Sequence, residues 1–257
     1  MLFSMAGKLN SSAMSYAICV VPVCPMRFEP FHVSEMVSQV LFGEPCMVLG
    51  STPGGFIRVR TLHDGYEGYC SENQFMLTDA EPQTGRLTAE WINEIIIRGI
   101  SMKIPFGSFI PELDGVSFNG KTWDIHKNGK GDLMIRKIAF MFINTPYLWG
   151  GRSVFGADCS GFVQTAFRYL NIALPRDAAH QAMKGEQVGL LQEVKCGDLA
   201  FFDDPEGNII HVGMLLNESS IIHAYGKVRV DDIDNEGILN ADTGNRSHRL
   251  RVIKRFL

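Results

Sequence analysis

Three side chains in the second half of the chain suit nucleophilic catalysis, and the first is Cys159. It lies between Gly156 and Gly161 and precedes an apolar pattern at helical spacing, which predicts the start of a buried helix. The unpaired N–H groups of a helix N-terminus favour the thiolate, which is the nucleophilic form of cysteine. Helix position alone also fits an inert buried thiol, which is the more common role of a free cysteine.

Two histidines favour the catalytic interpretation. His211 and His223 each lie in an apolar run typical of a buried strand, 209–216 and 220–225, and their separation of 12 residues suits adjacent antiparallel strands. A polar ring in such a run needs a hydrogen-bonding partner. If both rings face the helix start, one is the general base for Cys159 and the other orients it. A single strand histidine is more often a core residue, so the pair carries the argument.

The chain around these residues divides into three regions. Residues 15–79 contain short β-rich runs separated by turn residues, which is typical of a small barrel. Residues 80–130 contain further short strands and end in the glycine-rich segment 128–131, although 88–97 also fits a helix. From residue 132 the pattern favours helices followed by antiparallel strands, an α+β layout. We therefore predict domains at 1–79, 80–130 and 131–257.

The segment 13–23 is apolar enough to raise the question of a signal peptide. Pro22 interrupts it and no small-residue cleavage site follows, so Val20, Val21 and Val23 favour a first β-strand instead. We therefore expect a cytoplasmic protein, with the periplasm as the alternative.

Composition excludes several classes of protein. The 257 residues are 46% hydrophobic and 20% charged, with a net charge of −4, which excludes a disordered chain and a basic nucleic-acid-binding surface. No apolar run reaches the roughly 18 residues that a membrane helix needs. The six cysteines form no CxxC pair, and the cysteines and histidines show no spacing of metal ligands. We expect a monomer with free thiols, no metal, no cofactor, and no nucleic-acid or membrane partner.

Residues 146–178, with the block Asp-Cys-Ser-Gly-Phe at 158–162, resemble the signature of the NlpC/P60 family of papain-like cysteine peptidases. The segments IIHVGM and IIHA match the two histidine blocks of that family. This resemblance spans residues 132–257. It implies that Cys159 is the nucleophile, His211 the general base and His223 the orienting residue, and that Tyr147 helps to stabilise the oxyanion.

The same resemblance implies substrate-binding residues next to the nucleophile. Asp158 and Ser160 would hold the substrate, and Asp177 would line the site. Ala178 stands where many relatives have a serine, which puts a hydrogen bond from that position in doubt. Asp158 is equally suited to cap the helix that begins at Cys159.

The N-terminal half resembles bacterial SH3-like domains, at 34–44 and 64–69 for one and at 104–108 for another. Together with the enzyme domain this resembles the γ-D-glutamyl-L-diamino-acid endopeptidases. The resemblance implies a murein peptide with a free N-terminal L-Ala, cleaved after D-Glu to release L-Ala-γ-D-Glu. Its amine would be held by Glu35 and Tyr69, with Tyr66 and Glu67 as alternatives. A solvated Glu35 and a Tyr69 that packs in the barrel are the simpler interpretations.

The predicted fold is α+β, a papain-like catalytic domain preceded by two small SH3-like β-barrels. Two other functions stay open, a catalytically dead module that binds the cell wall and a hydrolase or acyltransferase that acts on intact peptidoglycan. The reactivity of the Cys159 thiol separates the first from an active enzyme. A comparison of whole sacculi with a soluble tripeptide separates the second.

Overall fold

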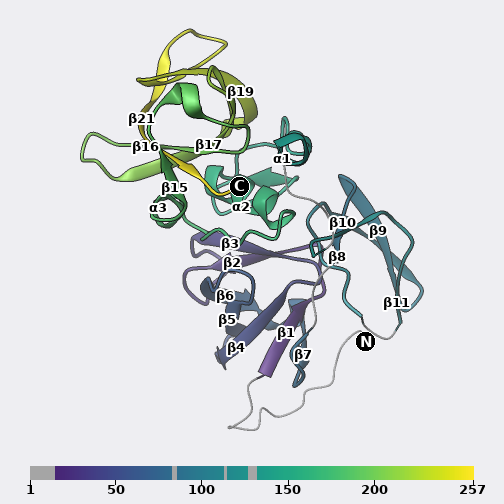
Figure 1. Ribbon diagram of the computed structural model, residues 1–257. Coiled ribbons are helices and arrows are strands. Elements are labelled where there is room, and N and C mark those ends of the chain that lie inside the picture. Colours follow the sequence, from purple (N-terminus) through teal and green to yellow (C-terminus); the bar gives the residue numbers. More distant parts are fainter. Residues whose placement is uncertain (1–14, 83–85, 113–114, 127–131) are drawn as a thin grey trace. The chain divides into compact units, whose positions relative to one another are not determined.

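A computed structural model describes residues 15–82, 86–112, 115–126 and 132–257. The chain forms two compact units, Met1–His126 and Lys127–Leu257, which we call the N-terminal unit and the C-terminal unit (Figure 1). The glycine-rich boundary predicted at 128–131 lies outside the described residues, and the predicted domain limits stay predictions. In the described ranges, no helix is long and apolar enough to cross a membrane.

The N-terminal unit begins with a seven-stranded antiparallel, barrel-like sheet in the order β3-β2-β6-β5-β4-β1-β7. The prediction of a first strand at Val20–Val23 is wrong. The chain leaves β1 at Cys19 and enters β2 at Val23, because Pro22 has no N–H to donate to a sheet ladder. The strands are β1 Ser15–Cys19, β2 Val23–Arg27, β3 Met36–Leu41, β4 Pro45–Ser51, β5 Phe56–Thr61, β6 Glu67–Ser71 and β7 Phe75–Thr78, with a 3₁₀ turn at Glu72–Gln74 between the last two.

The described part of the N-terminal unit also contains two smaller sheets, with strand orders β10-β9-β11 and β12-β8. The ambiguous segment 88–97 contains a strand rather than a helix, since its β-branched isoleucines alternate between buried and exposed positions along β9. The strands are β8 Arg86–Thr88, β9 Ile92–Ile97, β10 Ile100–Pro105, β11 Val116–Phe118 and β12 Thr122–Asp124.

Over residues 132–257, the C-terminal unit combines three helices with a second seven-stranded antiparallel sheet, β15-β21-β16-β17-β18-β19-β20. Strand β20 pairs with β21 as well as with β19, so six of these strands close into a ring. The helices are α1 Asp132–Phe140, α2 Cys159–Arg168 and α3 Ala178–Ala182, and a short hairpin consists of β13 Arg152–Ser153 and β14 Gly156–Ala157. The sheet strands are β15 Glu186–Val188, β16 Leu199–Asp203, β17 Ile209–Asn217, β18 Ser220–Tyr225, β19 Lys227–Asp234, β20 Gly237–Leu239 and β21 Arg246–Arg255, and a 3₁₀ turn spans Leu191–Glu193.

Helix α2 packs against β17 and β18 in the C-terminal unit. Its ten residues are all buried, which agrees with the predicted buried helix that begins at Cys159. The strands β16, β17 and β18 also lie where the sequence predicts them. This α+β arrangement confirms the predicted fold class.

Candidate active site

Cys159 is the first residue of α2, and the residues around it fix the helix start. Asp158 is the N-cap, and its carboxylate accepts a hydrogen bond from the Gly161 N–H at 2.7 Å. A Cβ on Gly161 would lie only 2.1 Å from the carbonyl oxygen of Gly151. A glycine is therefore required where the loop before the nucleophile crosses the first turn of α2.

The Cys159 thiol is protonated in the resting site, although a helix N-terminus by itself favours the thiolate. Burial raises the pKa of Cys159 to about 12, and the negative charge of Asp158 acts in the same direction. Hydrogen bonds from the N–H groups of Val212 and Ser160 and the charge of Arg176 oppose this shift without cancelling it. The thiol therefore needs a base, and its contact with Val212 places it next to the strand that carries His211.

His211 on β17 and His223 on β18 lie on adjacent antiparallel strands, as predicted. The His211 Nε2 and His223 Nδ1 atoms are 2.9 Å apart, and both rings are buried. Gly213 lies directly opposite His223, and a Cβ there would be 2.9 Å from the His223 Cβ. The absence of a side chain at residue 213 therefore makes room for the second ring.

Asp231 is the hydrogen-bonding partner of the second histidine of this pair. The His223 Nε2 atom lies 3.0 Å from the Asp231 Oδ2 atom, and the Asp231 side chain is fully buried. The other carboxylate oxygen accepts hydrogen bonds from the Arg229 guanidinium and from the Ala241 N–H. Sequence analysis missed Asp231, although the signal was a carboxylate eight residues after His223, a spacing that places both on one strand pair.

His248 on β21 is a third histidine that sequence analysis missed. Its ring stacks on that of His211, with ring centroids 4.1 Å apart and planes 20° apart. Burial and the charge of His223 lower the pKa of His248 to about 4 against the opposing effect of Asp231. Burial, His248 and His223 likewise hold the pKa of His211 well below its ordinary value. The His211 ring is therefore neutral at rest, so one of its ring nitrogens has a lone pair that can accept a proton.

Three histidines are also a common set of metal ligands, and here one ring nitrogen from each lies within 4.8 Å of the others. A metal ion must lie in the plane of each ring that binds it, because the nitrogen lone pair lies in that plane. The stacked rings of His211 and His248 have nearly parallel planes, so these planes do not meet at a common ion position. The observed orientation therefore fits a hydrogen-bonded pair better than a metal centre.

The Asp158 carboxylate is buried in an ion pair with Arg176, whose side chain is 2% exposed. Arg176 donates from both terminal nitrogens, and the carboxylate also accepts from the Gly150 N–H, the Gly161 N–H and the Ser160 hydroxyl. Asp158 is thus a helix cap and an ion-pair partner. Its predicted bond to a substrate amine stays a prediction, and it requires one of these donors to give way. Sequence analysis missed Arg176, since nothing local marks it.

Two further predicted residues lie in the C-terminal unit. Burial and the charges of Cys159 and Asp158 raise the pKa of Tyr147 to about 12, so its phenol keeps its proton. An isolated β-bridge pairs Tyr147 with Ala157, two residues before the nucleophile, and its phenol has an O–H group to donate. Asp177 is the N-cap residue of α3 and pairs with the exposed His180 at 3.5 Å, a partner outside the cysteine–histidine cluster.

The predicted amine-binding residues all belong to the N-terminal unit. Glu35 is exposed just before β3, and Tyr69 is partly buried on β6 opposite Arg58. Of the alternatives, Tyr66 packs against the barrel core, and Glu67 pairs with two arginines, Arg58 and Arg60. The approach of any of these side chains to Cys159 stays a prediction.

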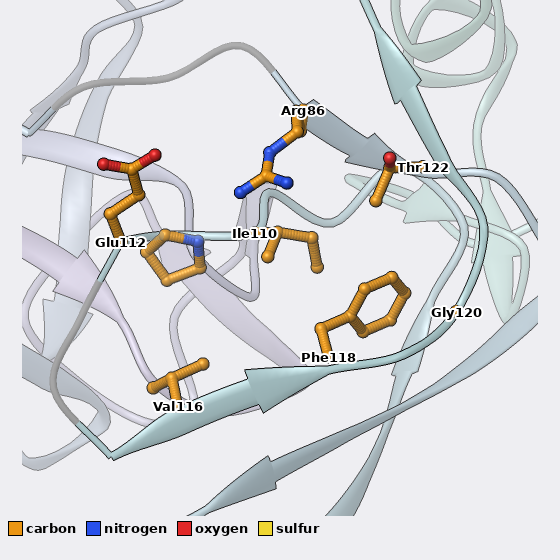
Figure 2. A pocket seen from close by; sticks show the side chains of 8 residues that line it. Arg86, Ile110, Glu112, Val116, Phe118, Gly120 and Thr122 are labelled. Atoms are coloured by element: carbon orange, nitrogen blue, oxygen red, sulfur yellow. The ribbon is translucent and has the colours of Figure 1, made fainter.

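A separate pocket of about 320 Å³ lies within the N-terminal unit (Figure 2). Arg86, Ile110 and Phe118 form part of its wall, and Glu112 lies at its edge. It contains none of the predicted site residues.

Comparison with known proteins places both units. Residues 144–247 match the model of the NlpC/P60 family, and residues 26–75 match the model of the bacterial dipeptidyl-peptidase Sh3 domain. A solved NlpC/P60 family protein from Bacillus cereus has a TM-score of 0.76 at 19% identity, covering 94% of this chain and 99% of that chain. This likeness supports the fold.

Three curated relatives carry the sequence similarity. Dipeptidyl-peptidase 6 of Lysinibacillus sphaericus is 24% identical over 86% of this chain and 92% of its own length. Gamma-D-glutamyl-L-lysine dipeptidyl-peptidase of Bacillus subtilis is 41% identical over 38% of this chain, a match that spans 33% of that relative. A protein of Haemophilus influenzae named "Probable endopeptidase" is 45% identical over 42% of this chain and 71% of its own length. The chain therefore belongs to the NlpC/P60 family of cysteine peptidases.

Proposed function

We propose that this peptidase cleaves peptides derived from peptidoglycan between the γ-carboxyl group of D-Glu and an L-diamino acid. The substrate has a free N-terminal L-Ala, and the released product is L-Ala-γ-D-Glu. The observation that carries this proposal is the joint presence, in one chain, of the Cys159 cluster and an SH3 domain of the dipeptidyl-peptidase type. The names of the Lysinibacillus and Bacillus relatives support the same substrate class.

The reaction is acyl transfer through a covalent intermediate on Cys159. His211 accepts the thiol proton at Nδ1, since its Nε2 atom is engaged with His223, and the Sγ atom attacks the carbonyl carbon. The Cys159 N–H and the Tyr147 hydroxyl donate hydrogen bonds to the oxyanion. His211 then protonates the leaving amine as the C–N bond breaks. Water hydrolyses the thioester and regenerates the thiol.

Recognition of a free amine requires an anionic partner, because an unpaired ammonium is costly to remove from water. We assign this role to Asp158 and Glu35, with Tyr69 as a hydrogen-bonding partner of the amine, while Ser160 and Asp177 line the rest of the substrate site. Reduced thiols suit a reducing compartment, and four buried free cysteines in the N-terminal unit favour cytoplasmic recycling of small wall peptides.

The test is cleavage of L-Ala-γ-D-Glu-L-Lys, its diaminopimelate analogue and the N-acetylated peptide, followed by mass spectrometry. Cys159→Ala removes the nucleophile, and Cys196→Ala is the matched control because Cys196 lies outside the cluster. We expect L-Ala-γ-D-Glu only from free-amine peptides, with wild type and the control. Equal cleavage of the acetylated peptide would refute the amine requirement. Cleavage of whole sacculi alone would replace this proposal with a hydrolase of intact peptidoglycan.

A further inference from the structure

The buried carboxylate of Asp231 lies at the end of a chain of hydrogen bonds that leads through His223 to His211, the proposed base. His211 Nε2 contacts His223 Nδ1 at 2.9 Å, and His223 Nε2 contacts Asp231 Oδ2 at 3.0 Å. All three side chains are buried, so water does not compete for these bonds. The direction of each bond therefore depends on which ring nitrogens carry protons.

The surroundings of Asp231 fix that direction. Its Oδ1 atom accepts from Arg229 Nε at 3.0 Å, from Arg229 Nη2 at 2.8 Å and from the Ala241 N–H at 2.9 Å. Burial raises the pKa of Asp231, but hydrogen bonds from His223, Ala241 and Arg229 outweigh it and lower the pKa to about 2. The group is thus a carboxylate, which accepts hydrogen bonds and donates none.

The need for a donor to Asp231 fixes the position of the proton on His223, and His223 in turn fixes it on His211. With one proton on its ring, His223 must carry that proton on Nε2 to donate to Asp231, which leaves a lone pair on Nδ1. The neutral His211 ring must then donate from Nε2 to that lone pair, which leaves its own lone pair on Nδ1. Only this tautomer of His211 can take the thiol proton of Cys159. Because the Cys159 thiol is protonated at rest, catalysis needs this lone pair on His211 Nδ1 to take the proton.

We infer that Asp231 is a positioning residue that sets the tautomers of both histidines and thereby the direction of proton transfer from Cys159. Asp231 contacts neither the substrate nor the thiol and acts through His223. This inference rests on the proposed roles of Cys159 and His211 as nucleophile and base.

Asp231→Asn is the decisive substitution because the hydrogen bonds around residue 231 would force both histidines into the opposite tautomer. The three N–H donors around Oδ1 hold the amide oxygen in that position, so the amide NH₂ group faces His223 Nε2. That nitrogen must then accept, and both histidines reverse their tautomers. Asp231→Ala instead leaves space for water, which can donate or accept. We therefore expect Asp231→Asn to be the slower enzyme and Asp231→Ala the less stable protein.

The first readout needs no substrate. The rate of alkylation of Cys159 by iodoacetamide is followed from pH 4 to 10 by mass spectrometry in a Cys196→Ser background, since Cys196 is the partly exposed thiol outside the site. We expect Asp231→Asn to lower this rate at least tenfold across the whole range, because a tautomer does not depend on pH. Asp242→Asn is the matched control. Asp242 also pairs with Arg229, but its side chain is 74% exposed, so alkylation should stay within twofold of wild type.

The second readout is kcat on the tripeptide, for which we expect a loss of roughly 10²–10⁴-fold with Asp231→Asn, as for asparagine in place of the aspartate of a catalytic triad. Alkylation within threefold of wild type, a smaller loss than with Asp231→Ala, or a mere shift of the pH profile would each overturn the inference. A wild type that is alkylated normally but leaves the tripeptide intact would refute the proposed substrate instead, and the alkylation series would still decide the role of Asp231.

Discussion

Replacement of Arg176 by methionine removes one partner of the buried ion pair with Asp158, the residue directly before the nucleophile. Arg176 is 2% exposed and binds the Asp158 carboxylate through two nitrogens. Loss of one member of a buried ion pair ordinarily costs about 3–5 kcal/mol, because a charge stays behind without its partner. Asp158 keeps three other donors, from Gly150, Gly161 and Ser160. We therefore expect Arg176→Met to lower the free energy of unfolding by about 3 kcal/mol, the low end of that range.

The assay is urea unfolding followed by tryptophan fluorescence in a Trp91→Phe/Trp123→Phe background, which leaves Trp149 as the reporter in the C-terminal unit. With an m-value of about 1.5 kcal/mol/M, the expected loss lowers the midpoint by about 2 M urea. A double-mutant cycle with Asp158→Asn isolates the pair, because asparagine still caps a helix. We expect a coupling energy of about 2 kcal/mol.

Two results would refute this reasoning. One is a loss below about 0.5 kcal/mol for Arg176→Met, which is the range of ordinary surface substitutions. The other is strict additivity in the cycle, since independent sites add within about 0.5 kcal/mol. Either would show that Arg176 and Asp158 do not stabilise each other in solution.

Three further predictions concern His211, its neighbour His248 and the helix residue Gly161. The low pKa of His211 keeps the base unprotonated in weak acid, so the acid limb of kcat/KM should lie below pH 6.5, and a limb above that value would contradict it. His248→Ala removes a half-buried neighbour that lowers the pKa of His211, so the limb should move to higher pH, whereas an unmoved limb would exclude the effect. Gly161→Ala should destabilise the unit by about 1–3 kcal/mol in thermal unfolding, because its Cβ meets the Gly151 carbonyl, although alanine ordinarily stabilises a helix.

The sequence predicts the elements whose apolar pattern is continuous. Helix α2 and strands β16, β17 and β18 bury long apolar runs, so periodicity alone locates them. The pattern fails for β19 and β21, which contain charged residues throughout. Those charges pair across strands, as Arg249 does with Asp203, and a single sequence gives no sign of such partners.

The candidate site divides in the same way. Cys159, His211 and His223 are identified by residue type, apolar surroundings and strand spacing. Arg176 and His248 are polar groups whose partners lie far along the chain, so no local pattern marks them. The protonated state of Cys159 depends on the burial of the thiol, whereas the sequence shows only the helix start that favours the thiolate.

The complete burial of α2 has a consequence for how the enzyme loses activity on heating. All ten residues of this helix are enclosed, so Cys159 cannot separate from His211 by fraying of an exposed helix end. Low-energy local openings occur where few buried contacts hold a segment, and α2 is the opposite case. Heat inactivation should therefore follow the cooperative melting of the whole C-terminal unit, with the same midpoint by activity and by circular dichroism.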